Sequence, residues 1–102
     1  MSNWYKITSI KNIPNMGSRV VEFGDIEIAI FKTKDNSIFA INNICPHKQG
    51  KLSEGLVHED IVTCPLHNWE ISLKSGEALG NDKGCTNIYE SKIEDEIIFL
   101  KI

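Results

Sequence analysis

The chain has 102 residues, of which 41% are hydrophobic and 25% are charged, and its formal net charge is −3. This balance is typical of one globular domain and excludes a disordered or collagen-like chain, while the lack of a basic excess argues against a nucleic-acid partner. The longest apolar runs, Ile28–Phe31 and Ile97–Leu100, are far shorter than the roughly 20 residues that span a bilayer. We therefore expect residues 1–102 to form a single soluble, cytoplasmic domain with no membrane partner.

Short strands separated by turns are predicted along most of the chain. β-branched and aromatic residues cluster or alternate over Trp4–Ile7, Arg19–Phe23, Ile26–Phe31, Ser37–Ile41, Thr86–Lys92 and Glu96–Ile102. The expected turns are Gly24-Asp25, Lys34–Ser37 and Glu94-Asp95. No stretch keeps the apolar stripe of a long helix, so we predict an all-β fold, either a sandwich or a small barrel.

Between about residues 42 and 84 the sequence becomes loop-rich, and all three histidines lie there. Cys45-Pro46-His47 is followed, after sixteen residues, by Cys64-Pro65-Leu66-His67. Each group places a thiolate and an imidazole within one turn of chain, so two such loops can bind one metal centre from two sides. The proline after each cysteine stiffens its loop by fixing φ. Cys45, His47, Cys64 and His67 are therefore the candidate metal ligands.

Three interpretations of this spacing compete. The four residues could be two buried cysteines and two surface histidines that share no site. They could form a structural Cys₂His₂ zinc site, although zinc modules usually pair cysteine with cysteine and histidine with histidine over longer spacings. They could also bind a Rieske [2Fe–2S] cluster, in which two histidines replace two cysteines on one iron. The matched spacing favours the third interpretation. The chain has three cysteines, which cannot all be paired in disulfides, so a reducing compartment fits the sequence better than a disulfide framework.

The segment from Cys45-Pro-His to Cys64-Pro-Leu-His-Asn-Trp resembles Rieske-type ferredoxin domains, and the chain from about Trp4 onward resembles the small subunits of bacterial assimilatory NAD(P)H-dependent nitrite reductases. This resemblance implies a Rieske-type fold of stacked antiparallel sheets, with a small cluster-binding subdomain formed by the two Cys/His loops. It implies one [2Fe–2S] cluster per chain, with Cys45 and Cys64 on the buried iron and His47 and His67 on the outer one. Histidine ligation leaves the oxidised cluster less negative than four thiolates would, which raises its reduction potential.

The resemblance further implies a subunit that is not catalytic by itself and that supports electron transfer in a complex with the large flavin- and sirohaem-bearing subunit, which reduces nitrite to ammonium. No small-molecule substrate is expected to bind this chain directly. One alternative is a soluble Rieske ferredoxin that delivers electrons to an aromatic-ring dioxygenase, and another is a zinc-stabilised interaction module. Asn68 follows the second histidine where dioxygenase ferredoxins usually have glycine, which favours the nitrite reductase resemblance. Docking to the larger partner would use the tip formed by the two Cys/His loops, where Lys48 and Lys51 would place positive charge.

Three further residues near the motif have simpler expected roles. We expect His58 to be a turn residue in the hairpin that joins the two loops, Cys85 to be a packed thiol, and Trp69 to be a core anchor. No Ser/His/Asp set, phosphate-binding loop or carboxylate pair indicates independent catalysis.

Overall fold

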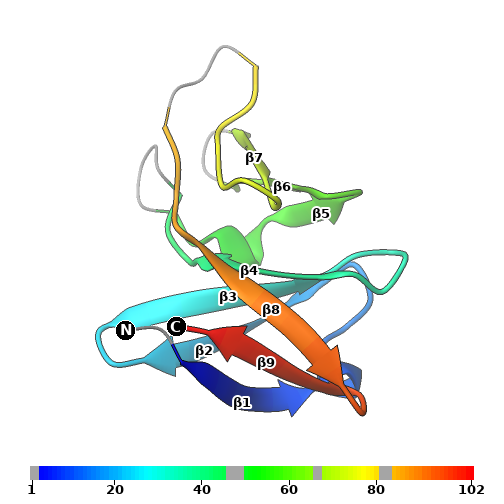
Figure 1. Cartoon of the computed structure of the whole chain (residues 1–102). Coiled ribbons are helices and arrows are strands. Elements are labelled where there is room, and N and C mark those ends of the chain that lie inside the picture. Colours follow the sequence, from blue (N-terminus) through cyan, green and yellow to red (C-terminus); the bar gives the residue numbers. More distant parts are fainter. Residues whose placement is uncertain (1–2, 46–49, 66–67, 81–83) are drawn as a thin grey trace.

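The computed structural model describes residues 3–45, 50–65, 68–80 and 84–102, which form two antiparallel sheets (Figure 1). The larger sheet has six strands in the order β1-β9-β8-β4-β3-β2, and the smaller has three in the order β5-β6-β7. The strands are β1 Trp4–Ser9, β2 Ser18–Phe23, β3 Ile26–Lys32, β4 Ile38–Asn42, β5 Leu56–His58, β6 Ile61–Thr63, β7 Glu70–Ser72, β8 Ile88–Glu94 and β9 Ile97–Lys101. Two short 3₁₀ helices, η1 Ile10–Asn12 and η2 Leu52–Glu54, complete the elements. The predicted all-β fold of stacked antiparallel sheets is confirmed.

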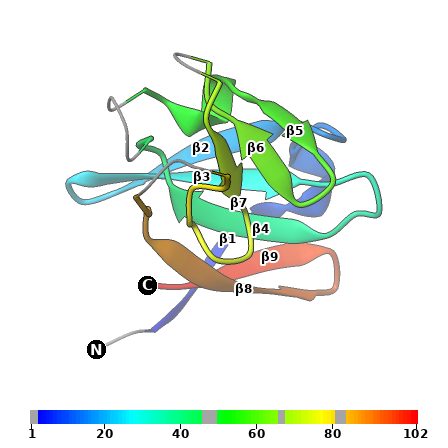
Figure 2. The same cartoon turned by 90° about the horizontal axis from the view of Figure 1, so that it is seen from above.

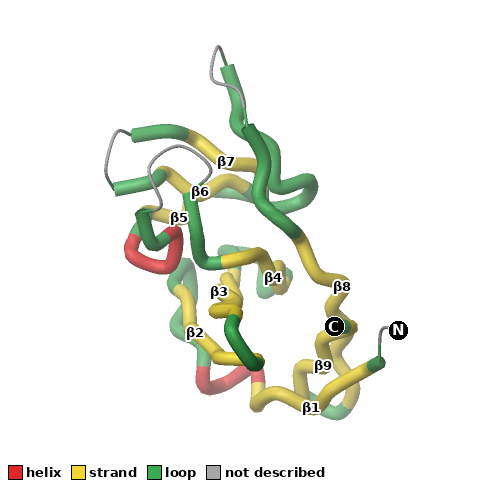
Figure 3. The backbone as a smooth tube through the Cα atoms, turned by 90° about the vertical axis from the view of Figure 1, so that its left-hand side faces the viewer, coloured by secondary structure: helices red, strands yellow, loops and turns green. Residues whose placement is uncertain are grey.

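The six-stranded sheet curls until its two edge strands approach each other. Figure 3 shows the strands arranged around a ring, with β1 and β2 as the free edges. Tyr5 on β1 and Phe23 on β2 meet edge to face with ring centroids 4.9 Å apart, so aromatic contact links edges that share no ladder hydrogen bonds. The result is a nearly closed barrel, which protects both edges from pairing with other chains.

The three-stranded sheet lies over one half of the barrel. Figure 2 shows β5, β6 and β7 above the side formed by β2, β3 and β4. All three strands come from the loop-rich stretch between residues 42 and 84, so the expected small subdomain is present as a sheet of its own. No helix in the described part of the chain is long and apolar enough to cross a membrane.

Two apolar clusters explain why the middle of β3, Ile28–Phe31, is an unbroken apolar run. Successive side chains of a strand point to opposite faces, so a strand that is buried on both faces has no polar positions. Inside the barrel lie Ile13, Ile28, Ile30, Ile38, Ala40, Ile98 and Leu100. Between the barrel and the small sheet lie Ala29, Phe31, Ile41, Cys45, Leu52, Val57, Val62, Cys64, Ile71 and Leu73. β3 therefore connects the scaffold to the layer that contains both candidate cysteines.

The hairpin turns agree with the sequence except for one shift. Gly24-Asp25 joins β2 to β3 as predicted, with Gly24 at φ 62° and Phe23 paired with Ile26. The last turn is Asp95-Glu96 rather than Glu94-Asp95, and both residues have positive φ, 51° and 67°. A two-residue hairpin with positive φ at both central positions matches the twist of its strands. The pairing of Glu94 with Ile97 places the turn one residue later than expected.

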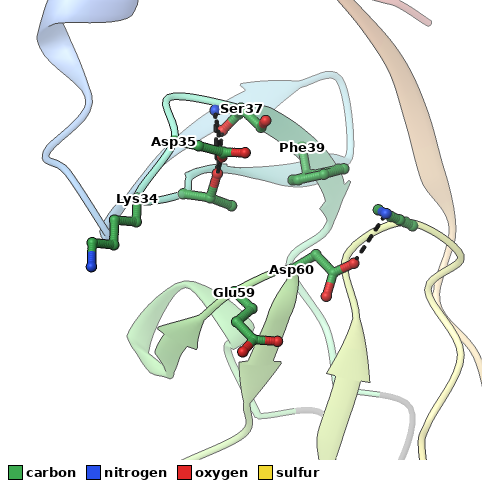
Figure 4. A pocket seen from close by; sticks show the side chains of 8 residues that line it. Lys34, Asp35, Ser37, Phe39, Glu59 and Asp60 are labelled. Atoms are coloured by element: carbon green, nitrogen blue, oxygen red, sulfur yellow. Dashed lines mark hydrogen bonds and ion pairs between the residues drawn. The ribbon is translucent and has the colours of Figure 1, made fainter.

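The β3–β4 turn contains a carboxylate whose ionisation can be measured separately. Figure 4 shows Asp35 beside Ser37; the Thr33 hydroxyl donates a hydrogen bond to the Asp35 carboxylate, and the Ser37 amide also donates to it. These hydrogen bonds, first that from Thr33, hold the pKa of Asp35 below its usual value. The Asp35 contribution to stability is therefore present above the ordinary aspartate pKa and is lost as pH falls through the lowered value.

Replacing Thr33 by valine is expected to raise the pKa of Asp35 toward that of an unperturbed aspartate. The substitution removes the hydrogen bond that lowers this pKa most. An NMR titration of the Asp35 side-chain carbon in both proteins measures this change. An unchanged midpoint in Thr33→Val would show that the hydroxyl does not hold the carboxylate in its charged form.

Candidate metal centre

Cys45 begins the first predicted ligand loop shortly after β4 ends at Asn42. Its side chain is almost fully buried, with 1% of its surface exposed. Its backbone N–H donates to the Gly50 carbonyl at 2.7 Å, which closes a six-residue loop. The position of Cys45 is therefore set by the end of a barrel strand and by its own loop closure.

Cys64 begins the second predicted ligand loop directly after β6 and is fully buried. Its backbone N–H donates to the Trp69 carbonyl, also at 2.7 Å and also five residues along the chain. The two loops thus have the same length and the same closing bond, from the cysteine amide to the fifth residue after it. The two motifs therefore share a closing backbone hydrogen bond as well as a sequence pattern.

The two cysteines lie in one apolar cluster, between the barrel and the small sheet. Leu52, Val62 and Ile71 belong to the same cluster and are fully buried. A water-excluding apolar layer around soft sulfur donors suits a metal–sulfur centre, because it controls solvent access to the ligands. His47 and His67, the other two candidate ligands, lie outside the described residues. Among the residues that are described, no group of three metal-ligating side chains occurs.

The chain segment before and after the first loop is held by a buried asparagine that the sequence analysis did not single out. Asn43 is only 2% exposed; its Oδ1 accepts from the Ser53 amide at 2.7 Å, and its Nδ2 donates to Glu27 Oε1 at 3.2 Å. Ser53 is held a second time, because the Ser18 hydroxyl donates to its carbonyl at 2.8 Å. Asn43 therefore connects β3 and η2 just before Cys45. In the sequence, this role is indicated only by the position of Asn43 between the apolar residues Ile41 and Ile44.

A glycine brings the two loops close together. Gly55 follows η2, and a Cβ atom at this position would lie 2.1 Å from the Thr63 carbonyl oxygen, immediately before Cys64. Real Cβ atoms do not approach an oxygen this closely, so a side chain here would displace the backbone. The end of the first loop region and the start of the second are in contact because residue 55 lacks a side chain.

The residues after the second motif combine a strained backbone position with a packed aromatic ring. Asn68 has φ 58°, and its amide donates to the Cys64 carbonyl at 3.1 Å. Asparagine and glycine are the residues that most easily adopt this left-handed conformation. Asn68 stands where dioxygenase ferredoxins usually have glycine, and either residue can adopt the left-handed backbone that this position requires. Trp69 is half-buried and packs against the apolar cluster, as expected of a core anchor.

Two expectations about neighbouring residues are wrong. His58 is the last residue of β5 rather than part of the turn, which is formed by Glu59 and Asp60. Cys85 is exposed rather than packed. Its backbone forms an isolated bridge with Glu77 outside the named strands, where no apolar layer covers the thiol.

The lysines expected at the docking tip have different outcomes. Lys51 is exposed and lies 3.6 Å from Glu27, so its charge is partly compensated by an acidic partner. Lys48 lies outside the described residues. The expectation of a net positive tip is therefore weakened at Lys51.

A recess lies elsewhere, at the seam between the barrel and the small sheet (Figure 4). Its volume is about 660 Å³, and its walls come from the β3–β4 turn, the β5–β6 turn and Lys74, which forms an ion pair with Asp60 at 3.3 Å. Neither Cys45 nor Cys64 lines it. This recess is therefore separate from the candidate metal centre.

Comparison with known proteins supports the iron–sulfur interpretation. The Rieske [2Fe–2S] domain family matches residues 3–90. The ferredoxin component of the naphthalene 1,2-dioxygenase/salicylate 5-hydroxylase systems of a Ralstonia species is 28% identical over 98% of this chain and 96% of its own length. The ferredoxin subunit of 3-phenylpropionate/cinnamic acid dioxygenase from Photorhabdus laumondii is 34% identical over 72% of this chain and 69% of its own length. The solved structure of the Escherichia coli protein NirD is 29% identical, covers 100% of this chain and 98% of its own, and superposes with a TM-score of 0.87.

Proposed function

The chain belongs to the Rieske [2Fe–2S] domain family, and from this premise we propose that it is the iron–sulfur small subunit of an assimilatory NAD(P)H-dependent nitrite reductase. A Rieske domain carries a [2Fe–2S] cluster, so the cofactor of this chain is a [2Fe–2S] cluster and the zinc interpretation is set aside. When bound, the cluster takes up and releases one electron at a time. We assign Cys45 and Cys64 as ligands of one iron and His47 and His67 as ligands of the other.

The described residues fit this cofactor. Two buried thiols from equivalent loops reach the same apolar cluster, and thiolates are the ligands that iron–sulfur clusters require. The apolar cluster around both sulfurs excludes water from them, and the Asn43 and Gly55 contacts hold the two loops together. We therefore propose that residues 1–102 form one Rieske domain, with the cluster-binding loops between about residues 42 and 84.

The end-to-end likeness to NirD supports the nitrite reductase assignment. NirD proteins are nitrite reductase small subunits, and the match leaves no large segment of either chain uncovered. We propose that the large nitrite reductase subunit is the partner in the cytoplasm and that it holds the groups that reduce nitrite, since a one-electron centre alone cannot carry out a six-electron reduction. The large subunit is then where activity resides.

A second candidate is a Rieske ferredoxin for an aromatic-ring dioxygenase. The Ralstonia and Photorhabdus relatives are ferredoxin components of such systems, at identities similar to or above that of NirD. Asn68 separates the two candidates less than the sequence suggests, because its left-handed backbone accepts either asparagine or glycine. The partner protein must therefore separate them.

An affinity pull-down of the cluster-loaded protein from cells grown on nitrate or nitrite as the nitrogen source tests the partner. We expect the large nitrite reductase subunit to be recovered and to be lost when the chain is omitted. Growth on ammonium with an aromatic carbon source is the matched condition for the second candidate. Recovery of an oxygenase or its reductase, without nitrite reductase, would replace the proposal by the ferredoxin function.

A further inference from the structure

His58 extends across the outer face of the small sheet toward the second ligand loop. In this sheet Val57, Val62 and Ile71 form one cross-strand row and are buried. The residues on either side of that row therefore point to the opposite face. One outer row is Leu56, Thr63 and Glu70, and the other is His58, Ile61 and Ser72.

The His58 ring joins all three strands from this face. Its Nε2 lies 2.8 Å from the Thr63 hydroxyl on β6 and 3.5 Å from Glu70 Oε2 on β7. Thr63 immediately precedes Cys64, and Glu70 immediately follows Trp69, whose carbonyl closes the Cys64 loop. The two partners of His58 are therefore the residues where the second loop leaves β6 and enters β7.

The bonds at Nε2 depend on whether the ring is charged. In a neutral ring with the proton on Nδ1, Nε2 accepts from the Thr63 hydroxyl and has no proton to give Glu70. In the charged ring Nε2–H donates, and the positive charge attracts the Glu70 carboxylate. Protonation thus adds a β5–β7 attraction to the β5–β6 hydrogen bond.

We propose that His58 and Glu70 form a proton-dependent clamp that positions the second ligand loop by holding its two ends, at Thr63 and Glu70, to β5. The identification of this loop as a cluster-binding loop rests on the proposed function. The clamp is tighter when His58 is protonated and looser when it is neutral. Changing the pH across the range in which histidine side chains ordinarily gain a proton is therefore the experimental way to switch the clamp.

Few other described charges adjoin this ring. β6 has no charged residue, and Glu70 is the charged residue of β7. In the β5–β6 turn, Glu59 follows His58, whereas Asp60 is ion-paired with Lys74. Glu59 thus provides a matched control, since it is an acidic neighbour in sequence that forms neither of the two Nε2 contacts.

Hydrogen–deuterium exchange with mass spectrometry tests the clamp in the cluster-loaded protein. Protection of the β6–β7 hairpin is measured at pH 5.5 and 8.0 and divided by protection of the β2–β3 hairpin, which contains no histidine and corrects for the pH dependence of exchange itself. Because both partners are about half exposed, we expect a two- to fivefold higher ratio at the lower pH, roughly the range of a surface ion pair.

The pH effect on this ratio is expected to disappear in Glu70→Gln and in His58→Gln and to persist in Glu59→Gln. A wild-type ratio that is the same at both pH values would overturn the proposal, and so would a pH effect that Glu70→Gln retains, because another group would then be responsible. Iron and sulfide contents of the same samples test the proposed function independently: a protein without a cluster would refute that function while the exchange ratios still decide the clamp.

Discussion

Cys64→Ser and Cys45→Ser are each expected to lose the cluster and to lower the stability of the protein strongly. Both side chains are buried in the apolar layer between the sheets, where serine places a harder oxygen donor and a polar hydroxyl. Burying a hydroxyl there costs about 1–3 kcal/mol. The free energy of cluster binding is lost as well, since it is also folding free energy. Iron analysis and thermal unfolding of the purified variants measure both effects.

Cys85→Ser is the matched control for these variants. The Cys85 thiol is exposed, and the backbone of Cys85 forms an isolated bridge with Glu77. We therefore expect unchanged iron content and a melting temperature close to that of the wild type. If Cys45→Ser and Cys64→Ser keep full iron, the ligand assignment is wrong. If Cys85→Ser loses iron, the third cysteine belongs to the centre after all.

Gly55→Ala is expected to disrupt the contact between the two loop regions strongly. The added Cβ would lie 2.1 Å from the Thr63 carbonyl oxygen and 3.0 Å from Val62 Cγ2. A backbone oxygen cannot rotate away as a flexible side chain can, so η2 and the end of β6 must separate. We expect a loss of about 2–3 kcal/mol in unfolding free energy, or roughly 10–20 °C in melting temperature, together with reduced iron content.

Gly24→Ala separates this steric effect from the general cost of replacing glycine. Gly24 has a positive φ of 62°, but a Cβ there would have no atom within 4 Å. We expect a loss of about 1 kcal/mol from backbone strain and unchanged iron binding. A Gly55→Ala protein as stable and as rich in iron as Gly24→Ala would show that the contact with Thr63 does not hold the two loops together.

The strands were predictable because their patterns are local. Trp4–Ile7 and Ile26–Phe31 combine β-propensity with short turns, and the structure places strands over both. The apolar run Ile28–Phe31 in the middle of β3 has a core on each face of the strand. The turn at Asp95-Glu96 was misplaced by one residue because several polar residues there fit a turn equally well, and only the pairing with β9 sets the register.

The spacing of Cys45 and Cys64 with their following histidines predicted that the two cysteines share one site, and both lie in one apolar cluster. The ligand roles of these four residues stay a prediction. Their supports were not predictable. Asn43 resembles a turn residue in sequence, and its hydrogen bonds to Ser53 and Glu27 depend on the packing of distant segments. Nothing local distinguishes Gly55 either, because its backbone has an ordinary φ of −83° and its role is a contact with Thr63. Cys85 was misjudged because cysteine is usually buried.

In the proposed function, two thiolates and two imidazoles of this chain bind one [2Fe–2S] cluster. Iron and sulfide analysis of anaerobically prepared protein, combined with pulsed EPR of the reduced form after labelling the histidines with ¹⁵N, tests it most directly. We expect two irons and two sulfides per chain and a reduced-state signal coupled to the nitrogens of two histidines. One zinc with no iron, or an iron–sulfur signal without histidine nitrogen coupling, would contradict it.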